Sequence, residues 1–253
     1  MSKRVDQLLL ERVAAALPLG ARLLDLPAGD GDLTRKLSEA GFAVTPSDRF
    51  PESFRWDEKR PVCSDMNLPL PFSDGAFDGV ICQEGIEHLE NPARFMRECA
   101  RVVRKGGFLW LTTPNFMDLS SRFAFLLTGM KSFHAGFPNE ETTVWGRDAG
   151  AIYHGHAFTL PFFQIRYLLR VCGFDQILLS GAGRSNTSAL LYPFIRPISS
   201  LLIHRGWRRR HRSGRHSNPS PGLLAELEEH AVSRELLLTK KILDESVCGK
   251  RRA

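Results

Sequence analysis

Residues 22–31 read RLLDLPAGDG, and this stretch decides the fold. A short apolar run containing one acid, Asp25, passes directly into a turn with Gly29 and Gly31. The next residues, 32–40, have helical spacing and end at a glycine that suits the position just after a helix. A strand ending in a glycine turn that opens a helix lets the backbone approach a ligand closely. We therefore predict a strand, turn and helix unit with a ligand site at its turn.

The residues around this turn favour a cationic ligand over a dinucleotide. The third glycine of the dinucleotide pattern GxGxxG falls at Thr34, so that pattern is incomplete. Asp25 lies four residues before Gly29, at the end of the predicted strand. A carboxylate there would repel a pyrophosphate and attract the ammonium and sulfonium groups of S-adenosylmethionine. An NAD-dependent dehydrogenase is accordingly the weaker interpretation.

Strands and helices alternate along most of the chain. The short apolar runs that predict further strands lie at 42–48, 61–64, 77–83, 108–113 and 174–180. Further segments with helical patterns lie at 4–17, 92–104 and 159–172. Such alternation implies a mostly parallel sheet with crossover helices. We predict the α/β class: a Rossmann-like, doubly wound, mostly parallel sheet with helices on both faces, in a single domain with insertions.

Further acids follow the next predicted strands. Asp48 lies about 20 residues beyond the turn, where an acid can accept hydrogen bonds from both ribose hydroxyls. Asp65 can accept from an adenine amino group, and the thioether of Met66 can pack on the ring. Gln83 and Glu84 would line the opening of the predicted ligand site, where the reaction takes place. The predicted cofactor-binding set is Asp25, Ala28, Gly29, Gly31, Asp48, Asp65, Met66 and Gln83.

Six segments resemble, in order, the landmarks of class I S-adenosylmethionine-dependent methyltransferases. They read LLDLPAGDG, TPSD, SDMNLPLPF, FDGVICQEGIEHLENP, RVVRKGGFLWLTTPN and HAFTLPFFQIRYLLRVCGF. The resemblance extends over roughly residues 20–180 and implies a methyltransferase with S-adenosylmethionine as its cofactor. One departure is Pro27, where that family often has glycine; it stiffens the turn but leaves Gly29 and Gly31 in place.

The segment after the fourth predicted strand, Glu84-Gly85-Ile86-Glu87-His88, has a resemblance of its own. It looks like the ExxEH signature of ubiquinone-pathway O-methyltransferases and of small-RNA 2′-O-methyltransferases. The resemblance implies a divalent metal held by these acids, this histidine and a later histidine. A bound Mg²⁺, Mn²⁺ or Zn²⁺ would acidify and orient an acceptor hydroxyl. The implied ligands here are Glu84, Glu87, His88 and His156.

A metal-free route is the simpler interpretation of the same histidines. Methyl transfer is an in-line displacement at carbon, and a hydroxyl acceptor must also lose a proton. His156 or His154 would serve as the general base, with His88 as a third candidate. In the alternative without a catalytic role, His88 caps a turn and Glu87 is solvated.

Residues 114–156 are rich in aromatic side chains and predict a loop-rich lid over the strand ends. Four aromatic residues in this segment or just after it either wall the acceptor pocket or form the core of the lid; they are Phe133, Phe137, Trp145 and Phe158. His134 is expected in a surface loop.

The chain divides into three predicted parts. The methyltransferase core occupies residues 1–180 and includes the lid. Residues 181–230 form an insertion that runs first apolar and then basic. Residues 231–253 form a C-terminal segment with the last strand of the sheet, expected at 235–243.

The net charge of +6 is concentrated in one stretch. Residues 204–216 read HRGWRRRHRSGRH and hold six arginines. The preceding apolar run, 189–203, is too short and too interrupted to span a bilayer. Together, residues 189–216 suit contact with an anionic membrane surface, and a lipid-linked acceptor would then be natural. The alternatives are a packed excursion with a solvated basic loop and, less favoured, binding of nucleic acid through its phosphates.

The cysteines argue against a disulfide framework or a zinc cage. None of them forms a CxxC pair, and they lie at Cys63, Cys82, Cys99, Cys172 and Cys248. The basic and amphipathic N-terminus does not read as a secretory signal. We therefore expect a cytoplasmic protein, with a peripheral position at the membrane as the alternative.

Together these patterns predict an S-adenosylmethionine-dependent methyltransferase that methylates a hydroxyl of a small molecule, a glycan or a lipid-linked acceptor. One alternative is a metal-assisted RNA 2′-O-methyltransferase. The other is a membrane-associated protein that binds S-adenosylmethionine without catalysis.

Overall fold

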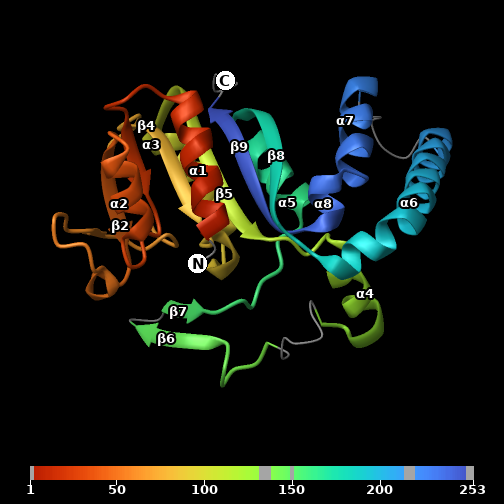
Figure 1. Ribbon diagram of the computed structural model, residues 1–253, viewed down its shortest axis with the longest axis horizontal. Helices are drawn as coiled ribbons and strands as arrows, with labels where there is room; N and C mark the ends of the chain where they lie inside the picture. The colour runs from red at the N-terminus through yellow and green to blue at the C-terminus, as the bar shows by residue number, and fades with distance from the viewer. Residues whose placement is uncertain (1–2, 131–137, 149–150, 214–219, 249–253) are drawn as a thin grey trace.

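The computed structural model describes residues 3–130, 138–148, 151–213 and 220–248. Within them a seven-stranded sheet has the order β3-β2-β1-β4-β5-β9-β8 (Figure 1). Its strands are β1 Arg22–Asp25, β2 Ala43–Asp48, β3 Val62–Cys63, β4 Phe77–Gln83, β5 Val103–Pro114, β8 Phe174–Arg184 and β9 Thr239–Cys248. The first five are parallel, and β9 lies antiparallel between β5 and β8. The predicted fold class is confirmed.

Helices cover both faces of this sheet. The helices of the described residues are α1 Lys3–Ala16, α2 Asp32–Glu39, α3 Pro92–Val102, α4 Leu119–Thr128, α5 Phe162–Val171, α6 Asn186–Ser213, α7 Pro221–Ala231 and α8 Arg234–Leu238. Two short 3₁₀ turns occupy Pro51–Ser53 and Ile86–His88. Helices α1 and α2 pack on one face, and α3 and α5 pack on the other.

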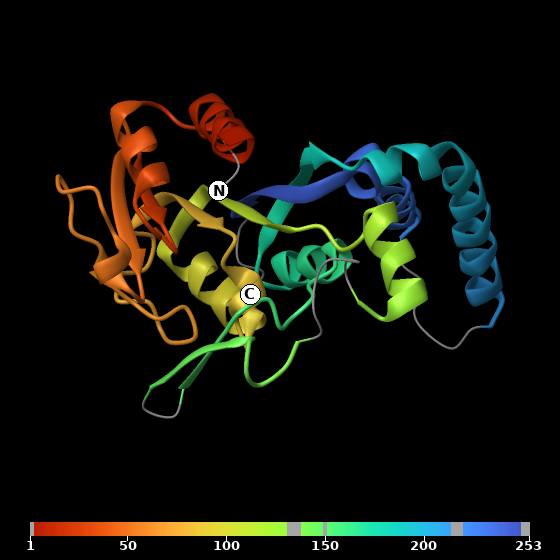
Figure 2. The same cartoon turned by 60° about the horizontal axis from the view of Figure 1, so that its bottom comes forward.

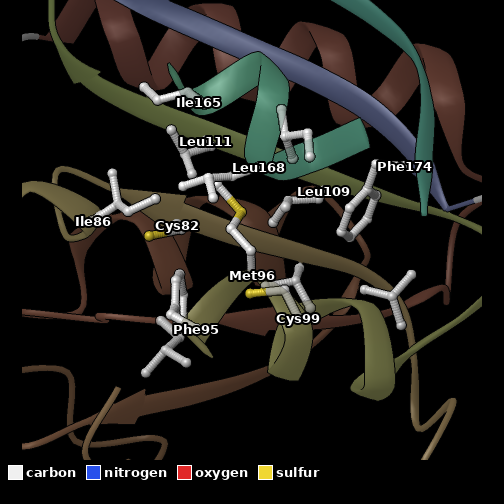
Figure 3. Packing of buried hydrophobic residues seen from close by; sticks show 14 of the residues in the cluster. Cys82, Ile86, Phe95, Met96, Cys99, Leu109, Leu111, Ile165, Leu168 and Phe174 are labelled. Atoms are coloured by element: carbon white, nitrogen blue, oxygen red, sulfur yellow. The ribbon is translucent and has the colours of Figure 1, made fainter. Parts of the chain in front are cut away.

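The buried parts of the central strands β1, β4 and β5 are mostly apolar because both faces of the sheet are covered. On β5, Leu109 and Leu111 point into the cluster that contains α3 and α5, while Trp110 between them packs with α1 and α2. Neighbouring side chains of a strand point to opposite faces, so each face receives every second residue. Figure 3 shows the first of these clusters, with Met96 of α3 among the side chains of α5 and the sheet.

The end of the chain differs from the prediction. The strand expected at 235–243 begins only at Thr239, because Arg234–Leu238 forms the short helix α8. Ser233 caps this helix by accepting a 3.2 Å hydrogen bond from the Leu236 backbone N–H. A short apolar run has the same composition in a buried helix as in a strand, which explains the error.

The segment expected to be a loop-rich lid contains regular structure. Asp118 caps α4 by accepting hydrogen bonds from the backbone N–H groups of Ser120 and Ser121. A separate antiparallel hairpin joins β6, Val144–Asp148, to β7, Ala151–His154. In Figure 1 the hairpin and α4 both lie below the sheet. Phe133, His134 and Phe137 lie outside the described residues.

The apolar and basic insertion is mainly helical. Helix α6 runs through Pro193 and Pro197, and α7 follows it. Figure 2 shows α6 at the opposite end of the molecule from α1 and α2. No helix among the described residues has both the length and the apolar character needed to cross a membrane.

Candidate active site

A cavity of about 450 Å³ opens where β1, β2 and β4 end. Parallel strands bring their carboxyl ends to one edge of the sheet, which is where open α/β folds bind ligands. The predicted site residues that line this cavity are Asp25, Ala28, Gly29, Asp48, Asp65, Met66, Gln83, Glu84, His88 and His154. Gly31, Glu87 and His156 do not line it.

Asp25 is a buried carboxyl at the floor of the cavity. Its Oδ2 accepts a 2.5 Å hydrogen bond from Thr34 Oγ1, and among the described residues its Oδ1 has no partner. Burial raises the pKa of Asp25 to about 7, against the opposing effect of the Thr34 hydrogen bond, and the charge of Asp48 adds to the rise. A group in this state gains by pairing with a cation.

Hydrogen bonds to Asp48 and the ring of Phe54 restrict the conformation of the glycine turn. The Gly29 backbone N–H donates a 2.8 Å hydrogen bond to Asp48 Oδ2, and the Phe50 N–H donates one of the same length to Oδ1. Gly31 begins α2 with φ of +86°, and a Cβ there would lie 2.7 Å from the ring of Phe54. The turn therefore needs glycine at Gly31 for both its backbone angle and its space.

Asp65 belongs to a polar group that sequence reasoning did not predict. Arg49 Nε donates a 2.8 Å hydrogen bond to the Tyr153 hydroxyl, which in turn lies 3.4 Å from Asp65 Oδ2. Arg49 also forms a 3.8 Å ion pair with Asp65. Tyr153 comes from β7, so this group joins the β6–β7 hairpin to the ends of β2 and β3. The one feature of the sequence that could have identified Arg49 as a site residue is its position directly after Asp48.

Gln83 is linked to the first helix. Its Nε2 donates a 2.8 Å hydrogen bond to Oδ1 of Asp6, whose Oδ2 accepts a 2.6 Å hydrogen bond from Lys36 Nζ. Asp6 is a buried acid of α1 that sequence reasoning also missed. The sequence could have identified Asp6 because this acid lies at helical spacing from the apolar residues Leu9 and Val13, on the side of the helix that is expected to be buried.

Glu84 lies at the cavity mouth in an unusual backbone conformation. Its φ is +53°, which a residue other than glycine rarely adopts. Thr112 donates a 3.2 Å hydrogen bond to its Oε1, and Lys241 of β9 pairs with its Oε2. Lys241 is a further residue that the sequence pattern did not single out. The two carboxylate oxygens of Glu84 are therefore bonded to residues of β5 and β9.

Three of the four implied metal ligands come together. One ligand atom from each of Glu87, His88 and His156 lies within 4.8 Å of the other two. Glu87 is fully buried, its Oε2 accepts a 3.1 Å hydrogen bond from Thr113, and its Oε1 has no partner among the described residues. Burial raises the pKa of Glu87 to about 7, with a further rise from the charge of Glu84.

The hairpin positions the histidines. His88 Nδ1 lies 2.9 Å from the carbonyl oxygen of His154, and His154 Nε2 lies 2.9 Å from Glu90 Oε1. The ring of His88 also lies 4.8 Å, centroid to centroid, from the rings of both Trp145 and His156. Trp145 lines the cavity. Phe158 packs against His154 instead and does not line the cavity.

Comparisons with known proteins agree with this geometry. The family model described as "Methyltransferase domain" matches residues 24–111. A ubiquinone biosynthesis O-methyltransferase of Xanthomonas axonopodis pv. citri is 30% identical over 162 residues, covering 56% of this chain and 67% of the relative. One of the same name from Xanthomonas oryzae pv. oryzae is 34% identical over 116 residues, covering 42% of this chain and 48% of the relative. The chain thus spans about two thirds of the first relative and about half of the second.

A solved structure supports the fold as a whole. The SAM-dependent methyltransferase from Archaeoglobus fulgidus superimposes with a TM-score of 0.55 at 14% identity, over 96% of this chain and 94% of that one. The chain belongs to the class I S-adenosylmethionine-dependent methyltransferases.

Proposed function

We propose that this protein transfers a methyl group from S-adenosylmethionine to a hydroxyl oxygen of a small molecule, a glycan or a lipid-linked acceptor. One observation carries the proposal: the acids at the strand ends line the same cavity as His88 and His154. The names of the matched relatives support oxygen as the methylated atom and a small molecule as the acceptor, and favour neither RNA methylation nor binding without catalysis.

The residues of the cavity fit the family's cofactor. The unpartnered Oδ1 of Asp25 suits the ammonium of the methionine end, and Gly29 keeps the turn beside it free of side chains. Asp48 would accept from the ribose hydroxyls. Asp65 and Met66 would hold the adenine. When bound, S-adenosylmethionine supplies an activated methyl group on a cationic sulfur.

Of the three candidate bases, the geometry favours His88. If Nδ1–H donates to the His154 carbonyl, Nε2 keeps the lone pair that can accept a proton. His154 pairs with Glu90, and His156 does not line the cavity. In this mechanism His88 removes the hydroxyl proton as the acceptor oxygen approaches in line, and Trp145 helps to exclude water.

A metal-assisted version of the same reaction is the second candidate. The observation in its favour is the close approach of Glu87, His88 and His156, together with the unpartnered Oε1 of Glu87. Glu84 does not join this group, since its carboxylate pairs with Lys241. A divalent cation held by the three residues would acidify the acceptor hydroxyl.

The direct test is turnover by the purified full chain. S-adenosylhomocysteine formation would be measured with a panel of phenols and catechols with and without prenyl tails, with sugars, and with a short RNA. We expect turnover with at least one hydroxyl acceptor and a large loss in His88→Asn. Methylation of the RNA alone, or no product with any acceptor despite tight cofactor binding, would refute the proposal.

A further inference from the structure

Helix α6 has an exposed apolar stripe. Leu190, Phe194 and Ile198 are 71%, 66% and 53% exposed, and Leu201 and Leu202 continue the series. A spacing of four residues places Leu190, Phe194, Ile198 and Leu202 along one side of the helix. A continuous apolar stripe of this length on a surface helix marks an interaction site.

The start of α6 is firmly attached to the rest of the protein. Buried Ser188 donates a 2.8 Å hydrogen bond to Asp118 Oδ1 and accepts a 2.9 Å hydrogen bond from the Ser120 N–H. These bonds join α6 to α4, which has exposed apolar side chains of its own, including Phe125 and Leu126. Both helices lie at the same end of the molecule (Figures 1 and 2), and both have exposed apolar side chains.

The sequence that carries the stripe has charges of one sign, although Glu228 of α7 lies beside α6, with its Oε1 3.7 Å from His204 Nδ1. The sequence has no aspartate or glutamate from 176 to 225. The same stretch contains Arg184 and Arg196 and the arginine-rich stretch 204–216 that follows the stripe. An apolar helix face that leads into clustered arginines is complementary to a surface with an apolar interior and a negative border.

We propose that α6 docks on a membrane surface containing anionic lipid, with the stripe at the acyl boundary; the arginines in the sequence of α6 supply the positive charge that attracts the headgroups. A second copy of this chain would bring another acid-free stretch and could not neutralise the arginines through α6. An RNA partner would use the arginines and leave the stripe in water. The inference does not depend on methyl transfer, because it concerns binding alone.

The test is flotation of the full chain with vesicles. Vesicles of phosphatidylcholine mixed with phosphatidylglycerol should carry the protein upward, and vesicles of phosphatidylcholine alone should carry much less. The triple variant R208Q/R209Q/R210Q should lower the affinity roughly a hundredfold. The double variant Phe194→Ser with Leu202→Ser should lower it at least about tenfold.

A matched control separates docking from general surface change. Tyr167→Ser with Val171→Ser alters exposed side chains of α5, outside the stripe, and should leave flotation unchanged. Equal flotation with both vesicle types, or wild-type flotation by the stripe variant, would overturn the proposal. A dimer in light scattering that Phe194→Ser dissociates, without vesicle binding, would assign the stripe to self-association instead. RNA binding lost only in the arginine variant, again without vesicle binding, would assign the arginines to nucleic acid and overturn it as well.

Discussion

Thr34 donates a 2.5 Å hydrogen bond to one oxygen of Asp25, while among the described residues the other oxygen has no partner. The carboxyl is nearly inaccessible to solvent, so its charged form is poorly stabilised by the protein alone. Asp25 in this state destabilises the folded protein and increases its affinity for a cation. The proton that Asp25 retains on folding should affect both the pH dependence of stability and the protons released when a cation binds.

The first prediction concerns stability against pH. The pKa of Asp25 rises from 3.8 to about 7 on folding, so the folded state retains a proton that the unfolded chain releases between these values. The contribution of Asp25 to the free energy of unfolding should therefore fall as pH rises through this window, by about 4 kcal/mol at most, and level off above it. Asp25→Asn should make this slope shallower, leaving the part that the raised pKa of Glu87 causes, and should be the more stable protein at pH 8. Urea unfolding from pH 5 to pH 8 measures both.

The control for this prediction is Asp57→Asn, an exposed acid whose charge is not among the causes of the raised pKa of Asp25. It should retain the wild-type slope. An unchanged slope in Asp25→Asn would show that other groups cause the pH dependence.

The second prediction is proton release on cofactor binding. A cationic ammonium beside Asp25 lowers its pKa, so near pH 7 binding should release up to about half a proton from this group. Calorimetry in two buffers of different ionisation enthalpy detects the release as a difference in binding heat. Equal heats in both buffers would place the ammonium away from Asp25.

The third prediction concerns the turn itself. Gly31→Ala forces a side chain into a left-handed backbone position and against the ring of Phe54, and should destabilise the protein by roughly 1 to 3 kcal/mol. Gly222→Ala is the matched control, because Gly222 lies in helix α7 and a Cβ added there would meet no atom within 4 Å. Thermal unfolding should show a loss for the first and no loss for the second. Equal stability of the two variants would contradict the steric account.

The fourth prediction concerns Asp48. Asp48→Ala should weaken cofactor binding by roughly 1 to 3 kcal/mol, because it removes a charge-assisted acceptor and releases the Gly29 N–H. Calorimetric titration of the variant with cofactor measures the loss. Asp30→Ala, which alters an acid outside the cavity lining, should bind as the wild type does. Unchanged affinity in Asp48→Ala would remove this residue from the ribose site.

The strands and the acids at their ends were predictable because each has a local signal. Strand β4 has the predicted bounds because its centre, Val80-Ile81-Cys82, is apolar and buried on both faces of the sheet. The pair of Asp6 with Gln83 was not predictable, because it depends on how α1 docks on the sheet. The same holds for Tyr153, which reaches Arg49 only once the hairpin lies over the cavity. Tertiary docking has no signature in a short window of sequence.

The last prediction decides between the two routes of proton removal. If His88 acts alone, a chelator should leave turnover intact, and Glu87→Gln should retain most activity because the amide keeps a hydrogen-bonding partner for Thr113. If Glu87, His88 and His156 hold a metal, chelation should abolish turnover and added Mn²⁺ should restore it in the wild type. Glu87→Gln would then need far more metal for the same rate. His204→Asn, which alters an exposed histidine of α6 outside the cavity lining, serves as a control for loss of a histidine. We expect the metal-free pattern, with His88→Asn as the only one of these variants that loses most of its activity.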